Sequence, residues 1–225
     1  MDLRRKLWNQ QQQALRSALK LPTDHAQAID LFLGQHAMVH ASAMSRTKLY
    51  SFDDELWDGV SYEAARCIPP DGEHSIAWML WHTARIEDMT MNVLVAGGQQ
   101  VFDDGGWGER LNVPVHNTGN DMDAEAIAAL SAEIDIDALK AYRMAVGRRT
   151  REVVSQLTPE ETRRKVAAGR LQQLKEDGSV LETAQWLLDY WSGLTTAGLL
   201  LMPPTRHNFV HLNEAQKVKR KVCKG

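Results

Sequence analysis

The sequence predicts an all-α protein whose core is a four-helix bundle. Several long segments place apolar residues three or four positions apart, which is the spacing of a buried helix face. Glycine and proline clusters separate these segments, and few stretches alternate with the period of two that strands require. Hydrophobic residues make up 44% of the 225 positions, which is enough to form one substantial core.

The N-terminal part is expected to consist of two helices. Residues 2–19 form an amphipathic leading helix. The first bundle helix covers about 24–44 and starts at a good N-cap residue. This pattern divides the chain into a leading helix over residues 1–22 and a helical bundle domain over residues 23–225.

The second bundle helix is predicted from Ser75 to Gly97 and Gly98, because glycine readily adopts the left-handed conformation that ends a helix. Residues 99–122 carry several glycines, a proline and the sequence NTGND. Such a composition indicates a long loop after the second bundle helix, and long loops of this kind often cover a functional site.

Two further long helices and a final one complete the prediction. The third bundle helix covers about 136–157, and an apolar helix covers about 180–202. Pro203 and Pro204 are expected to end this helix. Thr205 then caps a last helix that runs to about Lys221.

Composition and charge argue against several classes of protein. The net charge of −3 gives no general basic field for nucleic acid. The longest apolar stretch, 184–202, contains Asp189 and two glycines, so a buried helix is expected and no membrane partner. Cys67 and Cys223 form no CxxC motif, and no signal-peptide core is present near the start. A cytoplasmic location is therefore expected.

The histidines are the candidate functional residues. His82 lies on the apolar face of the second bundle helix, so its ring points into the bundle and needs a partner there. His207 and His211 lie one turn apart on the last helix, where both imidazoles can reach one ion if a facing helix supplies a third ligand. His82 is that third candidate. A core histidine bonded to a carbonyl or an acid is the simpler alternative.

A second pair competes for the same role. His36 and His40 also lie one turn apart, on the apolar side of the first bundle helix, and spacing alone does not decide which pair holds an ion. Glu87, Asp88 and Glu214 are candidates for orienting a ligand imidazole or moving a proton. For Glu87 and Asp88 the alternative is a salt bridge at the helix surface with a nearby arginine, and no residue is singled out as catalytic.

Two motifs resemble those of a known family. The stretch SIAWMLWHTARIED at 75–88 resembles the second-helix motif of the DinB-like (damage-inducible, YfiT-like) superfamily, which supplies one metal ligand. The stretch RHNFVHLNEAQ at 206–216 resembles that family's final HxxxH motif. The resemblance implies a four-helix bundle and a divalent metal, zinc or nickel, held by His82, His207 and His211. The pair His36 and His40 does not belong to this ligand pattern.

The resemblance also implies a function. Better-understood members are similar to transferases or isomerases that use a low-molecular-weight thiol such as bacillithiol or mycothiol, so the expected protein is a metal-dependent enzyme with a small-molecule substrate. One alternative is a non-catalytic, stress-associated bundle with a structural metal or core histidines. Another is a metal-dependent hydrolase. Bundles of this type commonly pair, so a homodimer is expected, with Leu3, Leu7, Ala14 and Leu15 of the leading helix as its contact; the alternative is that this helix covers its own bundle.

Overall fold

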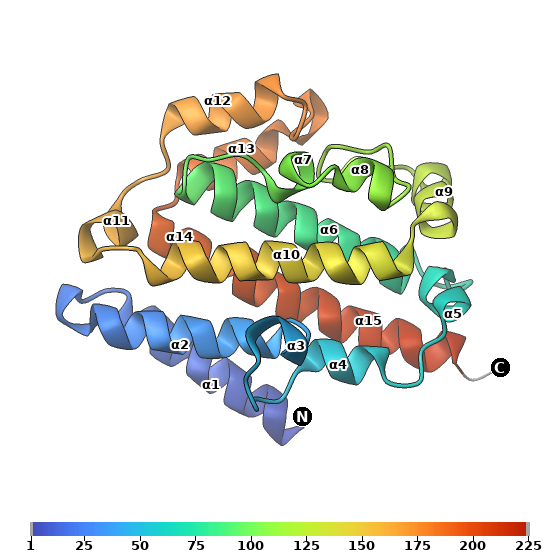
Figure 1. The fold of residues 1–225 in the computed structure, drawn as a ribbon, viewed down its shortest axis with the longest axis horizontal. Helices are drawn as coiled ribbons and strands as arrows, with labels where there is room; N and C mark the ends of the chain where they lie inside the picture. Colours follow the sequence, from blue (N-terminus) through green and yellow to red (C-terminus); the bar gives the residue numbers. More distant parts are fainter. Residues whose placement is uncertain (1, 224–225) are drawn as a thin grey trace.

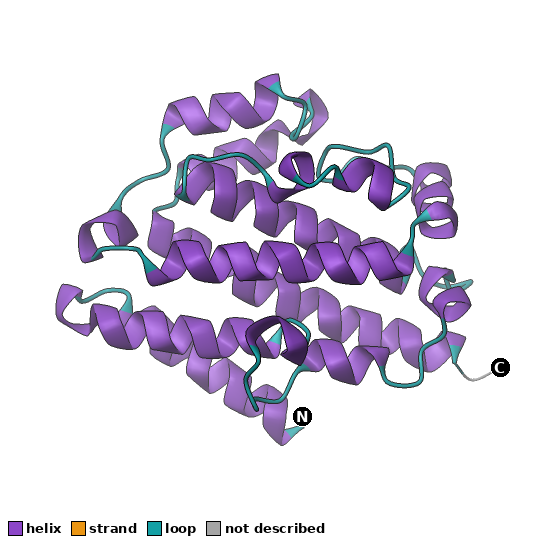
Figure 2. Ribbon diagram, viewed as in Figure 1, coloured by secondary structure: helices purple, strands orange, loops and turns teal. Residues whose placement is uncertain are grey.

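Four long helices lie alongside one another in the computed structural model, which describes residues 2–223 (Figure 1). They are α2 (His25–Met38), α6 (Ile76–Asp88), α10 (Ile136–Ser155) and α15 (Asn208–Val222). Helix α6 packs against both α10 and α15, and α10 also contacts α2. The predicted all-α class is confirmed, since residues 2–223 contain no strand beyond one isolated bridge between Lys165 and Thr195 (Figure 2).

The other helical segments connect or cover these four. The α-helices are α1 (Leu3–Ala18), α3 (Ser42–Ser45), α4 (Phe52–Trp57), α5 (Tyr62–Arg66), α7 (Val101–Asp104), α8 (Trp107–Arg110), α9 (Ala124–Glu133), α11 (Pro159–Arg163), α12 (Ala168–Glu176), α13 (Gln185–Ser192) and α14 (Thr196–Leu200). Two single turns are 3-10 helices, η1 (Pro22–Asp24) and η3 (Glu182–Ala184). Two segments are π-helical, η2 (Met89–Val95) and η4 (Met202–His207). No helix among the described residues combines the length and the apolar character needed to span a bilayer.

The leading helix α1 packs on α2 and α15 of its own bundle. Trp8 is fully buried and stacks on Phe209 of α15 with 3.8 Å between the ring centroids. Leu15 is also fully buried, so it does not serve as a contact to another copy. Leu3 and Leu7 remain exposed, and pairing of two copies through them stays a prediction.

The first bundle helix ends at Met38, six residues before the predicted end. Side chains from elsewhere bind the carbonyls that a longer helix would use. Arg143 donates to the oxygen of Val39, and Ser51 donates to the oxygen of His40. With these carbonyls satisfied by tertiary contacts, the chain turns away and forms the separate short helix α3.

The second bundle helix begins as predicted. The hydroxyl of Ser75 accepts a hydrogen bond from the backbone N–H of Trp78, and every residue of α6 is buried. The helix continues through η2, and the chain then reaches Gly97, whose φ of 71° is the left-handed conformation expected at a helix end. The predicted long loop follows, interrupted by the short helices α7 and α8.

The prediction of one apolar helix over 180–202 is wrong. The segment forms two helices, α13 and α14, because residues near Leu194 pair with the chain that follows α11. The N–H of Val166 donates to the oxygen of Leu194, and the N–H of Thr196 donates to the oxygen of Arg164. These contacts draw residues 193–195 out of helical geometry, and Thr195 caps α14.

Candidate metal centre

The structure brings together three histidines from two distant segments of the chain. His82 of α6 faces His207, at the end of η4, and His211 of α15. One ring nitrogen of each residue lies within 4.8 Å of one ring nitrogen of each of the others. The ring centroids are 5.1 Å apart for His82 and His207, 5.3 Å for His82 and His211, and 4.6 Å for His207 and His211. We call these residues the histidine triad.

The ring of His82 is held in one orientation. Its Nδ1 lies 2.7 Å from the backbone oxygen of Thr118, which only accepts, so Nδ1 carries the proton and Nε2 keeps its lone pair. The ring also stacks on Trp78 with a centroid separation of 4.9 Å. Thr118 belongs to the long loop, which thereby fixes the face that His82 presents to the other two histidines.

A wide π turn places His207 and His211. Pro203 and Pro204 lack the N–H groups that an α-helix needs. The predicted helix break is nevertheless wrong, because these residues form the π-helical segment η4, which leads directly into α15. Thr205 is therefore not the predicted cap. Its hydroxyl instead donates to the oxygen of Leu200 at 2.8 Å, and Gln12 donates to the oxygen of Leu201 at 2.8 Å. These side-chain donors replace the missing backbone donors.

Burial keeps the triad neutral at physiological pH. It lowers the pKa of His82 to about 3, and the neighbouring His211 adds to the shift. Burial lowers the pKa of His207 well below its usual range, with the other two imidazoles contributing, and it lowers the pKa of His211 as well. Neutral imidazoles offer the lone pairs that a metal ion requires.

The acidic residues near the triad take different positions. Glu214 lies beside it, with Oε2 2.8 Å from Nδ1 of His211, although the two atoms lack hydrogen-bond alignment. Asp88 does not take part, because its carboxylate accepts hydrogen bonds from Tyr142, Asn92 and the backbone N–H groups at the start of α7. Asp88 therefore anchors the long loop.

Glu87 binds the second histidine pair instead of the triad. Nε2 of His36 and Nε2 of His40 lie 2.9 and 3.0 Å from its two carboxylate oxygens. Thr150 and Asn208 donate to the same oxygens at 2.7 and 2.9 Å. We call these five residues the Glu87 cluster. Four donors therefore occupy the carboxylate. His36 comes from α2, His40 from the turn after α2, Thr150 from α10 and Asn208 from α15.

The electrostatics of the Glu87 cluster follow from its burial. All five of its side chains are buried. Burial alone raises the pKa of Glu87, but the two imidazoles and their hydrogen bonds outweigh it and hold that pKa well below its usual range. Burial lowers the pKa of His40 to about 4, against the opposing attraction of Glu87. The cluster is therefore a buried carboxylate that accepts hydrogen bonds from both imidazoles.

The alternative of a surface salt bridge for Glu87 and Asp88 is wrong, because both residues are fully buried. Asp88 does lie 3.6 Å from Arg85, but Arg85 is buried too. Arg148 and Arg149 are exposed, and Arg151 donates to the oxygen of Leu33.

A cavity of about 130 Å³ adjoins the triad. His82 and His207 form part of its wall, and α13 supplies aromatic side chains to the opposite part. No sequence pattern predicts this cavity, because its wall joins residues from four separate segments. The remaining lining residues are Ile86, Asn120, Trp186, Leu187, Tyr190, Trp191, Met202 and Pro203.

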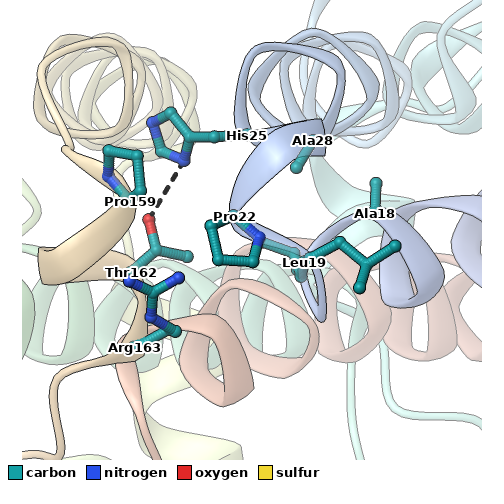
Figure 3. Close-up of a pocket in the computed structure, with 9 residues that line it drawn as sticks. Ala18, Leu19, Pro22, His25, Ala28, Pro159, Thr162 and Arg163 are labelled. Carbon is teal, nitrogen blue, oxygen red and sulfur yellow. Dashed lines mark hydrogen bonds between the residues drawn. The ribbon is translucent and has the colours of Figure 1, made fainter.

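Another depression lies between the turn after α1 and helix α11 (Figure 3). Its volume of about 10 Å³ holds about one water molecule, which is too little for a substrate. His25 in its wall is hydrogen-bonded to the oxygen of Leu157 at 2.7 Å and lies 3.5 Å from the hydroxyl of Thr162. This histidine links the start of α2 to the segment that leads into α11 and is not available as a ligand.

Comparison with known proteins adds the family. A search of curated proteins found no match. The family model of the DinB superfamily matches residues 54–191, which is more than half of the chain and includes α6 and α10. The match contains His82 but ends before His207 and begins after His40. The predicted resemblance is confirmed, and the chain belongs to the DinB superfamily.

Proposed function

We propose that the protein is a divalent-metal-dependent enzyme in which His82, His207 and His211 hold the ion. The single observation that carries this proposal is the arrangement of three neutral imidazoles from two helices, with one nitrogen of each within 4.8 Å of the others. Nδ1 of His207 is buried without a hydrogen-bond partner, and Nδ1 of His211 has none either, although Glu214 lies beside it. The donor set suits zinc or nickel.

Three protein ligands leave coordination positions for a substrate, which is typical of catalytic sites. A divalent ion on three neutral imidazoles keeps its full charge, and it lowers the pKa of a bound thiol or water toward neutrality. Thr118 keeps the proton of His82 on Nδ1 and so keeps its other nitrogen available. Glu214 beside His211 is half-exposed and is positioned to exchange a proton with solvent. This geometry suits a bound thiol and a bound water equally, and the family resemblance favours a transferase or isomerase that uses a small thiol.

The first test is the metal content of the purified protein. We expect about one equivalent of metal per chain by elemental analysis, and the substitution His207→Ala removes it. His116→Ala is the matched control, because His116 is a partly exposed histidine paired with Asp103 and lies outside the triad. A wild-type protein that binds no divalent ion at micromolar concentration would overturn the proposal.

A second test separates an enzyme from a structural metal and from a hydrolase. The cobalt-substituted protein is titrated with a small thiol, and its visible absorption is followed. A new thiolate-to-cobalt band supports thiol chemistry at an open position. An unchanged spectrum, together with a lower melting temperature after metal removal, supports a structural metal instead. A spectrum that changes only with pH supports bound water and hydrolysis.

A further inference from the structure

Helix α13 exposes two aromatic side chains beside the triad. Trp186 is 57% exposed and Tyr190 is 46% exposed, whereas the other six tryptophans are buried or partly buried. The two residues lie one helical turn apart, on the face of α13 that borders the 130 Å³ cavity. Their neighbours Leu187 and Trp191 are buried and anchor the helix, so the two aromatic rings are held at the cavity without being needed for the core.

The chemistry of the cavity wall is uniform. Apart from His82, His207 and Asn120, the lining is apolar or aromatic. No acidic residue, lysine or arginine lines it. A ligand part that lies here therefore gains from apolar contact and stacking, and a charged group would lose its hydration without a partner. The polar part of the ligand must face the two histidines.

The size of the cavity fixes the size of this ligand part. An apolar cavity of about 150 Å³ in a protein core binds benzene, and the cavity beside the triad has about 130 Å³. We infer that the site takes a small molecule with one aromatic ring or an apolar group of that size. The ring packs against Trp186, Tyr190 and Trp191, and the polar end points to His82 and His207. Only the position inferred for the ligand's polar end rests on the proposed metal site.

The test compares two ligands that share a metal-binding head. Acetohydroxamate and benzohydroxamate are titrated into the zinc-loaded protein by calorimetry. We expect benzohydroxamate to bind at least about tenfold more tightly, because its ring is removed from water. In the double variant Trp186→Ala with Tyr190→Ala, this ratio falls to about one while the affinity for acetohydroxamate stays unchanged. Tyr62→Ala, at an exposed tyrosine outside the cavity, keeps the ratio.

A second measurement works without metal. Phenol at millimolar concentration is added to the chelator-treated wild type, to His207→Ala and to the double variant, and binding is followed by saturation-transfer NMR. Signal in the first two and none in the third supports the ring site even if neither hydroxamate binds, in which case only the metal proposal fails. Equal affinity for both hydroxamates, or a phenol signal that survives in the double variant, overturns the inference.

Discussion

The two histidine pairs of this protein have the same spacing and different surroundings. His36 and His40, like His207 and His211, are four residues apart in the sequence and lie in the interior or at its edge, with His36 in α2, His40 just after it, and His207 and His211 in the continuous helical segment formed by η4 and α15. His36 and His40 face the carboxylate of Glu87, and the Nε2–H group of each histidine donates a hydrogen bond to that carboxylate. The second pair meets a third imidazole and a cavity. The residue opposite each pair, rather than the spacing, decides its chemistry.

The triad and the Glu87 cluster differ in the hydrogen-bond partners that their histidines already have. In the Glu87 cluster the carboxylate already has four hydrogen-bond donors, and Nδ1 of His36 is buried without a partner. A metal on Nε2 of either histidine would replace a hydrogen bond that the carboxylate already accepts. In the triad, Nδ1 of His82 has an acceptor in Thr118 and its Nε2 is available. We therefore expect the cluster to join helices and the triad to bind metal.

The largest expected effect is on stability, from Glu87→Ala. Removing the carboxylate leaves the donors of four buried side chains unpaired, so the free energy of unfolding should fall by about 3–5 kcal/mol. Glu87→Gln keeps the shape and one acceptor oxygen and should cost less. Urea denaturation of the metal-free protein measures both, with Glu152→Ala, at a residue 60% exposed, as the control. A loss under about 1 kcal/mol for Glu87→Ala would contradict a structural role.

The next effect is on metal affinity, and it compares the two pairs directly. Structural zinc sites with four ligands bind with about 10–16 kcal/mol, so each ligand contributes roughly 2.5–4 kcal/mol. We expect His82→Ala or His211→Ala to weaken binding by roughly two to three orders of magnitude. We expect His36→Ala and His40→Ala to keep one equivalent of metal. If His36→Ala and His40→Ala lose the metal while His82→Ala and His211→Ala retain it, the metal lies in the Glu87 cluster and not in the triad.

A smaller effect concerns pH, and its sign follows from His40. Its pKa is lowered to about 4 in the folded protein from 6.5 in the unfolded chain, so the unfolded chain binds more protons between these values. The stability of the metal-free protein should therefore be full above pH 6.5 and fall as the pH drops to about 4, by roughly 3 kcal/mol at most from this residue. His40→Gln should make the profile measured by urea denaturation less steep over this range, and the remaining slope comes from the triad histidines, whose pKa values are lowered as well. An equally steep profile in His40→Gln would show that other groups dominate.

The smallest effect is expected from Glu214→Gln. This residue contacts His211 from the solvent side, so its loss should weaken metal binding by about tenfold and change stability by less than about 0.5 kcal/mol. Competition with a chelator of known affinity measures the first quantity. The opposite pattern, a large loss of stability with unchanged metal affinity, would place Glu214 with the structural acids instead of the metal site.

Local signals in the sequence were sufficient for much of the fold. The cap at Ser75, the left-handed Gly97 and the long loop that follows are all as predicted, because each depends on neighbouring residues only. The errors occur where distant residues intervene. Hydrogen bonds from Arg143 and Ser51 end α2 early. Backbone hydrogen bonds to the chain after α11 divide the predicted 180–202 helix. Hydrogen bonds from Gln12 and Thr205 let the helical segment continue past Pro203 and Pro204.

The site shows the same division. Helical spacing placed His82 and the two HxxxH pairs on interior faces, because the 3.6-residue period fixes which side of a helix a residue occupies. Only the tertiary structure decided that Glu87, rather than a third histidine, faces His36 and His40, and that Thr118 orients His82. The cavity with Trp186 and Tyr190 also arises only there. A sequence sets the direction of each side chain from its own helix, but the partner it meets depends on how separate helices pack.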